Sequence, residues 1–204
     1  MTLQAASPRL TLASASAARA ALLAAAGVQF VAAAAAIDED GVKQSARADG
    51  LDADATALLL AELKAERVGR RFPDALVIGC DQLLVCEGRW FDKPDSRAVA
   101  RQQLQQLRGR THSLVTAVLC HRHGRRIWQH VARPSLAMRS FSDAFLDAYL
   151  DLEGDAILAC VGGYRLEGPG IQLFDRVDGA HDAILGLPML PLTGFLRQHG
   201  VLMA

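Results

Sequence analysis

The stretch VIGCDQLLVCEGRWFDKP, from Val77 to Pro94, decides the fold class. It opens with a run of Val and Ile that is typical of a buried strand, and the acid Asp81 follows this run after Gly79 and Cys80. We expect the strand to end at Asp81, with Lys93 one short hairpin downstream. A rigid sheet edge would then aim the Asp81 carboxylate into a cleft.

Strands and helices alternate on both sides of this stretch. Apolar periodicity predicts helices over 17–26 and 54–68, the second capped by Asp54, and further helices that follow Asp95 or Ser96, begin at Ser142 and end at Gly200. Strands are expected over 9–14, 113–120, 125–132, 134–140 and 183–188, with extended chain over 28–36. The alternation predicts an α/β fold with a mixed central sheet flanked by helices, as one domain over residues 1–204 with two lobes.

Composition excludes several classes of protein. The 204 residues carry 22 Lys and Arg against 22 Asp and Glu, without a long block of one sign, whereas nucleic-acid and membrane-surface proteins are usually basic. The basic segment HRHGRRIWQH, residues 121–130, is either a solvated hairpin tip around Gly124 or a phosphate contact. No segment is long and apolar enough for a transmembrane helix.

Cysteine use points to a cytoplasmic protein. The four cysteines are widely spaced and lack the Cys and His spacing of zinc sites, so buried free thiols in a reducing compartment are expected. The first 37 residues contain no acid and are rich in alanine, which leaves a signal peptide as an alternative. Arg19, Gly27 and Gln29 interrupt that segment, and an Ala-rich helix between two strands fits it better.

Acids and bases that could converge suggest phosphate chemistry. They are Asp38, Glu39, Lys64, Asp81, Lys93 and Glu167, with Arg19 near the first helix N-terminus. Mg²⁺ binds oxygen ligands, usually one or two carboxylates together with substrate phosphates, and Glu39 and Asp81 could serve in this way. Each residue also has an ordinary explanation as a turn cap or an exposed side chain, so the residues alone leave both interpretations open.

A series of fragments carries a more specific signal. These are LASASAARAALLAAAG, IDED, LAELKAE, VIGCDQLLV, DKP, LRGRTHSLVTA, VGGYRLEGPGIQLF and ILGLP. In this order and spacing, from Leu10 to about Gly200, they resemble the Maf family of nucleoside triphosphate pyrophosphatases. The resemblance implies two lobes around a nucleotide cleft, cleavage between the α and β phosphates, a divalent cation (Mg²⁺ or Mn²⁺), and a homodimer.

The resemblance also implies roles for individual residues. Asp81 matches the catalytic base that activates water with help from the metal ion, and Lys64 and Lys93 match polar groups that assist it at the phosphates. Glu39 would hold the metal with Asp81. The substrate would be bound by Ser14, Ser16, Ala18, Arg19, Gln82 and Glu167, of which Gln82 and Glu167 match positions that read the base and favour the 7-methyl-GTP branch of the family over the dTTP/UTP branch.

Departures from the family pattern lie in the loop of small residues around Ser14 and Ser16, which the resemblance implies holds the phosphates. Ala17 stands where the family has proline, Ala18 occupies a specificity position, and Ala20 replaces a second arginine. Loss of one charge-assisted contact costs about 1.5–3 kcal/mol. Arg139 or Arg165 could supply the positive charge that is missing at Ala20.

Two other hypotheses therefore stay open beside the enzyme. The first is a catalytically weakened nucleotide-binding protein linked to cell division, which the missing arginine motivates. The second is an exported protein that loses its first residues, which the acid-free start motivates.

Overall fold

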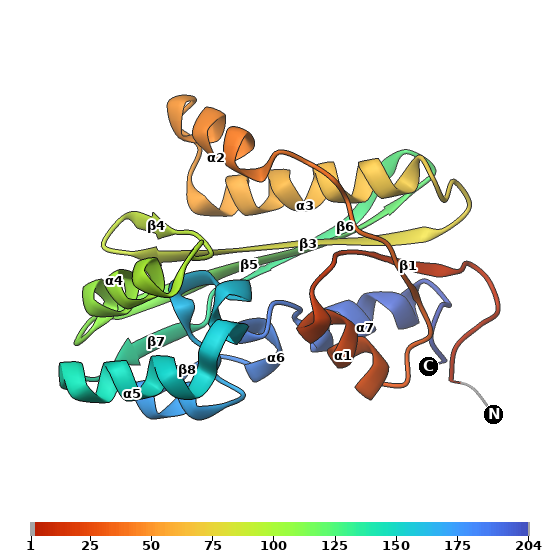
Figure 1. The fold of residues 1–204 in the computed structure, drawn as a ribbon. Helices are drawn as coiled ribbons and strands as arrows, with labels where there is room; N and C mark the ends of the chain where they lie inside the picture. The colour runs from red at the N-terminus through yellow and green to blue at the C-terminus, as the bar shows by residue number, and fades with distance from the viewer. Residues whose placement is uncertain (1–2, 204) are drawn as a thin grey trace. The chain divides into compact units, whose positions relative to one another are not determined.

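The computed structural model describes residues 3–203 and contains one mixed sheet with strand order β2-β1-β3-β5-β7-β8, to which β4 adds by pairing with β3 and β6 by pairing with β5 (Figure 1). The strands are β1 (Leu10–Ala13), β2 (Val31–Ala32), β3 (Leu76–Cys86), β4 (Arg89–Phe91), β5 (Thr111–Arg122), β6 (Arg125–Ala132), β7 (Ser135–Met138) and β8 (Phe174–Asp178). The helices are α1 (Ala17–Ala25), α2 (Glu39–Ala48), α3 (Ala53–Gly69), α4 (Arg97–Leu107), α5 (Asp143–Glu153), α6 (His181–Ile184) and α7 (Met189–Gln198), with short 3₁₀ helices at Gly154–Ala159, Val161–Gly163 and Pro169–Leu173. Parallel pairing of β1 with β2 and β3, and antiparallel pairing of β5 with β6 and β7, confirm the predicted mixed α/β class.

The chain divides into two compact units. Unit 1 contains the described residues of Met1–Asp81, Thr116–Ala132 and His181–Ala204, and unit 2 contains Gln82–Val115 and Arg133–Ala180. Strand β3 passes from unit 1 to unit 2 directly after Asp81, and β5 contributes to both.

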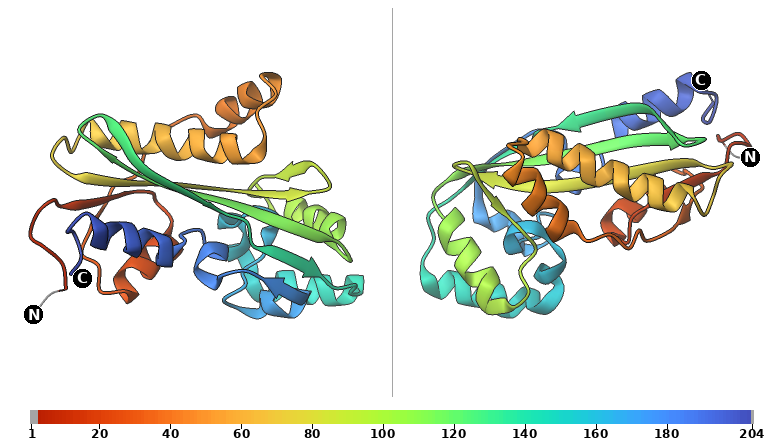
Figure 2. Two further views of the ribbon diagram at one scale, coloured as in Figure 1. Left: turned by 180° about the vertical axis from the view of Figure 1, so that it is seen from behind. Right: turned by 90° about the horizontal axis from the view of Figure 1, so that it is seen from above.

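Unit 1 has helices on both faces of its strands. Leu76, Ile78 and Cys80 of β3 join a buried core with leucines of β1, α1 and α7. Because successive strand residues point to opposite faces, Val77, Gly79 and Asp81 face the other side, where α3 lies (Figures 1 and 2). The alanine-rich segment that suggested a signal peptide forms β1 and α1, and Leu10, Leu12 and Leu23 within it are buried in this core.

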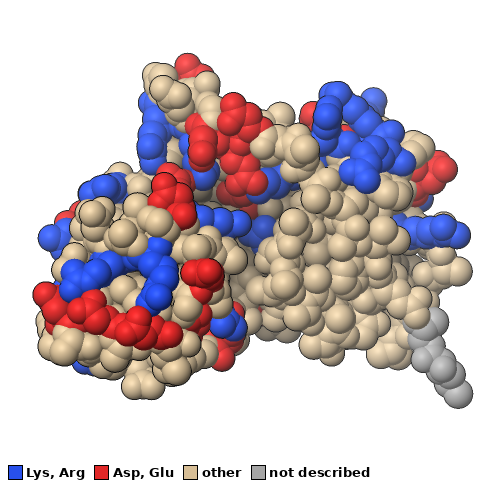
Figure 3. Space-filling view, viewed as in Figure 1, with Lys and Arg blue, Asp and Glu red and all other residues tan. Residues whose placement is uncertain are grey.

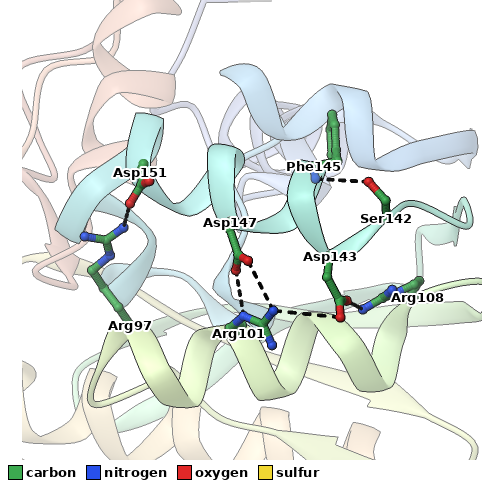
Figure 4. A network of polar contacts seen from close by, with 8 residues as sticks. All are labelled: Arg97, Arg101, Arg108, Ser142, Asp143, Phe145, Asp147 and Asp151. Carbon is green, nitrogen blue, oxygen red and sulfur yellow. Dashed lines mark hydrogen bonds and ion pairs between the residues drawn. The ribbon is translucent and has the colours of Figure 1, made fainter.

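Unit 2 contains a ladder of ion pairs between α4 and α5. Figure 4 shows the arginine–aspartate contacts Arg97–Asp151, Arg101–Asp147 and Arg108–Asp143, with closest distances of 2.6, 2.7 and 2.6 Å, and a longer contact between Arg101 and Asp143 at 4.0 Å. These pairs are largely exposed, so each contributes only about 0.2–1 kcal/mol. Burial of Leu104, Leu107, Leu146 and Leu150 stabilises the unit more.

Unit 2 also buries a neutral histidine. The His112 ring is 2% exposed, its Nε2 lies 2.8 Å from the Tyr164 hydroxyl, and Phe174 packs beside it. Burial lowers the pKa of His112 from 6.5 to about 4.

We therefore expect the protein to lose stability as pH falls from about 6.5 to 4. The unfolded chain takes up a proton on His112 in this range while the folded chain does not, which corresponds to roughly 3 kcal/mol in the free energy of unfolding. Urea unfolding of the parent and of His112→Gln across this range measures the effect, because Gln can still bond the Tyr164 hydroxyl. If the free energy of unfolding changed with pH in the same way in both proteins, His112 would not be the cause of the loss.

Several predicted boundaries were wrong. The segment AILGLP, residues 183–188, was predicted as a strand but contains the end of α6 and a turn, and the cap of α3 is Asp52 rather than Asp54. Asp81 lies inside β3, which continues to Cys86. The sequence interpretation missed α2 and β8. The hairpin around Gly124 and the Ser96 and Ser142 caps are confirmed. No helix within residues 3–203 combines the length and hydrophobicity needed to cross a bilayer.

Candidate active site

A buried acid–base pair lies in unit 1 where β3 faces α3. Asp81 of β3 is 4% exposed and Lys64 of α3 is 7% exposed, and the Lys64 Nζ lies 2.5 Å from the Asp81 Oδ1. The predicted helix is confirmed, but of the apolar stripe expected at Ala55, Leu59, Leu60 and Leu63 only Leu60 is buried. The buried face is formed by Thr56, Ala57, Leu60, Ala61, Lys64, Ala65 and Val68, so Lys64 lies on this face. A lysine and an aspartate that are both withdrawn from water are expensive to bury unless they are paired.

Gly79 allows α3 to approach β3 closely enough for this pair to form. A Cβ atom at Gly79 would lie 2.8 Å from the Ala65 Cβ and would also collide with the Ala61 carbonyl oxygen. Both Gly79 and Asp81 face α3, because they are two residues apart on one strand. The close contact of α3 with β3 therefore brings the Lys64 ammonium within reach of the Asp81 carboxylate.

A second carboxylate comes from α2. Asp38 caps this helix by accepting a hydrogen bond from the Gly41 amide at 3.0 Å, which places Glu39 in the first turn. The Glu39 Oε1 lies 2.7 Å from the Lys64 Nζ, and the Glu39 side chain is 41% exposed. The ammonium of Lys64 thus contacts one buried and one accessible carboxylate.

Arg19 is held at the start of α1 by three acceptors. Its Nε donates to the Gly186 carbonyl at 2.8 Å, and its Nη1 donates to the Ser14 hydroxyl at 3.2 Å and the Cys80 carbonyl at 3.3 Å. Ser16 caps α1 by accepting from the Arg19 amide. The structure therefore brings Ser14, Ser16 and Arg19 together, with Ala18 beside them on α1, half-buried.

The turn at Gly186 is a contributor that the sequence interpretation missed. Gly186 has a φ of +98°, and a Cβ there would lie 3.0 Å from the Arg19 Nε. A strand over 183–188 would not present this carbonyl in the same way. The only signal in the sequence was the glycine itself within an apolar run.

Electrostatics favour a proton acceptor at Asp81. Burial raises the pKa of its carboxyl above the ordinary value, the charges of Lys64 and Arg19 oppose this shift, and Glu39 adds to it. A carboxylate with a raised pKa is a better general base than an exposed one. Burial also raises the pKa of the neighbouring Cys80 thiol, so this thiol stays protonated and unreactive.

The remaining predicted site residues belong to unit 2. Gln82 follows Asp81 on β3 and is half-buried, Lys93 is exposed after β4, and Glu167 accepts from the Arg165 Nε at 3.3 Å. Lys93 and Glu167 both act electrostatically on Cys160, whose pKa burial raises. These three residues are accessible, as substrate-binding residues must be.

Arg139 and Arg165, the possible replacements for the arginine missing at Ala20, are both engaged within unit 2. Arg165 pairs with the buried Glu153 at 3.2 Å as well as with Glu167, and the Arg139 Nε donates to the Gln172 carbonyl at 2.5 Å. Neither guanidinium is available without giving up these contacts.

The carboxylates of Glu39 and Asp81 fit a hard divalent cation. Mg²⁺ and Mn²⁺ prefer oxygen ligands, and these two side chains approach the same Lys64 ammonium. The chemistry of these two oxygen donors suits an ion that is shared with substrate phosphates.

Comparison with known proteins gives one consistent family. The Maf-like protein family model matches residues 9–199. A nucleoside triphosphate pyrophosphatase of Granulibacter bethesdensis is 58% identical over 95% of this chain and 98% of its own length. A protein of the same name from Rhodospirillum rubrum is 52% identical over 97% and 98%, and a 7-methyl-GTP pyrophosphatase of Rhizobium meliloti is 47% identical over 96% and 98%. The chain belongs to the Maf family.

Proposed function

We propose that this protein is a nucleoside triphosphate pyrophosphatase that hydrolyses the α-β phosphoanhydride and releases a nucleoside monophosphate and pyrophosphate. The observation that carries the proposal is the buried Asp81 carboxylate with Lys64 and Glu39 around it. A carboxylate kept from bulk water, next to a fixed ammonium, suits the activation of one water molecule at a polyanionic substrate. Relatives of nearly the same length that carry this name support the reaction.

In the proposed mechanism Asp81 accepts the proton of the attacking water. Lys64 holds the Asp81 carboxylate in place and offsets negative charge as it develops on the phosphates. Arg19, Ser14 and Ser16 bind the phosphate tail at the N-terminus of α1, where backbone amides favour anions. Asp81 thus takes the proton, and Arg19, Ser14 and Ser16 hold the phosphates near the attacking water. The fold fixes the positions of all four residues.

We propose that Glu39 and Asp81 hold the divalent cation, Mg²⁺ or Mn²⁺. When bound, the ion would neutralise phosphate charge and lower the pKa of a coordinated water. Glu39 suits this role because its side chain remains partly accessible beside the buried Lys64.

The roles of Gln82, Lys93 and Glu167 are also proposals. Lys93 would contact the phosphates, and Gln82 and Glu167 would read the base, which favours 7-methyl-GTP. Their accessibility supports this assignment. A single catalytic domain, a homodimer and a cytoplasmic location likewise stay predictions.

The reaction is tested by incubating the purified protein with Mg²⁺ or Mn²⁺ and a panel of standard, methylated and deaminated triphosphates, with products identified by mass. We expect monophosphate and pyrophosphate, and a kcat/KM for 7-methyl-GTP about tenfold or more above that for dTTP or UTP. Release of inorganic phosphate with a nucleoside diphosphate would overturn the reaction. A preference for dTTP or UTP would overturn only the proposed substrate.

The second candidate is a nucleotide-binding regulator that has lost turnover. Ala20 favours it, because the α1 N-terminus carries one arginine, and that arginine is already bonded to three acceptors. Nucleotide binding without product formation, unchanged by Asp81→Asn, would support this candidate over the enzyme.

A further inference from the structure

A group of metal-binding side chains lies in unit 1 apart from the Asp81 group. Glu62 and Glu66 of α3 and His121 of β5 each offer a ligand atom, and these atoms lie within 4.8 Å of one another. The two glutamates are four residues apart on one helix, which places them on the same face one turn apart. Residues far apart in the sequence therefore converge with two oxygen donors and one nitrogen donor.

His121 is the most informative member of the group. It is 4% exposed and lines the same cavity as Glu66. Its ring nitrogen and one carboxylate oxygen from each glutamate are close enough together to hold one ion between them.

The strand geometry keeps His121 directed at α3. Arg126 of β6 is the cross-strand partner of His121, and the register of the ladder shifts between Cys120 and His121. Directly paired residues share a face of the sheet, and the Arg126 Nη1 reaches the Glu62 Oε2 at 2.9 Å. Carboxylates that bind metals are commonly held by such a hydrogen bond, which fixes the direction of the other oxygen.

Space for further ligands is present beside the donors. A cavity of about 440 Å³ is lined by Glu66 and His121 together with Arg70, Arg122 and the turn at Gly124. Figure 3 shows Lys and Arg side chains gathered where α3 ends near the β5–β6 hairpin. Three protein ligands with an open side are typical of sites that keep a position for water or an anion, and the arginines here favour an anion.

We propose that Glu62, Glu66 and His121 form a binding site for a divalent transition-metal ion of the Zn²⁺ class. The imidazole nitrogen selects such an ion over Mg²⁺ and Ca²⁺, which prefer oxygen ligands alone. The bound ion would tie α3 to β5. Since α3 also carries Lys64, the site would restrain the helix that positions the proposed catalytic pair.

The test uses tag-free protein that has been stripped with a chelator and titrated with Zn²⁺ by calorimetry and with Co²⁺ by visible absorption. We expect one equivalent to bind, Tm to rise with Zn²⁺, and a large excess of Mg²⁺ not to compete. His121→Gln and Glu66→Gln should each weaken binding at least about tenfold and abolish the Tm rise.

Two control variants separate this site from its surroundings. His181→Gln changes an exposed histidine that neither belongs to the donor group nor lines the cavity, and this variant should bind as the parent does. Glu39→Gln changes the other proposed metal ligand and should also leave Zn²⁺ binding intact. No binding by the parent, or equal binding by the parent, His121→Gln and Glu66→Gln with circular dichroism showing folded protein, would overturn the proposal.

Discussion

Asp81→Asn is expected to lower kcat by a factor on the order of 10²–10⁴, with substrate binding retained. Asparagine has the same shape and its carbonyl oxygen can still accept from the Lys64 ammonium, which lies 2.5 Å from the Asp81 Oδ1. The substitution therefore removes proton acceptance while keeping the packing. Steady-state kinetics with the best triphosphate of the panel measure kcat, and binding of a non-hydrolysable analogue measures affinity.

The pH profile gives the same residue a second test. Burial raises the pKa of Asp81, so the acidic limb of kcat/KM should lie above 3.8, the ordinary value for aspartate. Activity should fall as pH drops through this limb, because the protonated carboxyl cannot accept a proton. Asp81→Asn should lose the limb together with most of the rate.

The matched control is Asp74→Asn, which removes the same charge from an exposed residue just before β3. It should retain the parental kcat. An equal loss in the two variants would mean that net charge rather than proton transfer matters, and a kcat unchanged by Asp81→Asn would exclude Asp81 as the base.

Local sequence signals predicted β1, α1 and α3 of unit 1, but the same unit contains the missed helix α2 and the wrongly predicted strand over 183–188. Apolar residues at helical spacing predicted α3, and Gly27 marked the end of α1. The strand over 183–188 failed for a physical reason, since a short apolar run is compatible with a strand or with a buried turn next to a helix. Contacts made in the folded chain distinguish the two, such as the hydrogen bond from Arg19 to the Gly186 carbonyl and that from Thr116 to the Ala183 carbonyl.

The position of Asp81 within β3 could not be predicted from its neighbours. A carboxylate after an apolar run normally indicates the end of a strand, because an unpaired charge is costly inside a sheet. Here Lys64 compensates from another element, and Gly79 admits the helix that carries it. Glu39 was named both from its residue chemistry and by resemblance, whereas the helix α2 that positions it was missed because its sequence is mostly polar.

The second large effect is expected when the ion pair between Lys64 and Asp81 is removed. Lys64→Met should lower the free energy of unfolding near neutral pH by about 3–5 kcal/mol, because it leaves Asp81 buried without its cation. The pKa of Asp81 should rise further, so the carboxyl should be protonated in more of the folded molecules and kcat should fall. Urea unfolding and kinetics on the same samples measure both effects. Lys64→Arg, which keeps the charge, should lose less stability than Lys64→Met.

The pH dependence of stability and a double variant test whether the loss of stability in Lys64→Met comes from the unpaired Asp81 carboxylate. A carboxyl whose pKa is raised in the folded state favours folding below its unfolded value and opposes it as pH rises, so Lys64→Met should be relatively less destabilised near pH 5 than near pH 8. Adding Asp81→Asn to Lys64→Met removes the unpaired charge and should restore part of the lost stability. Strict additivity of the two substitutions would mean that the ammonium and the carboxylate do not depend on one another, contrary to their contact in the structure.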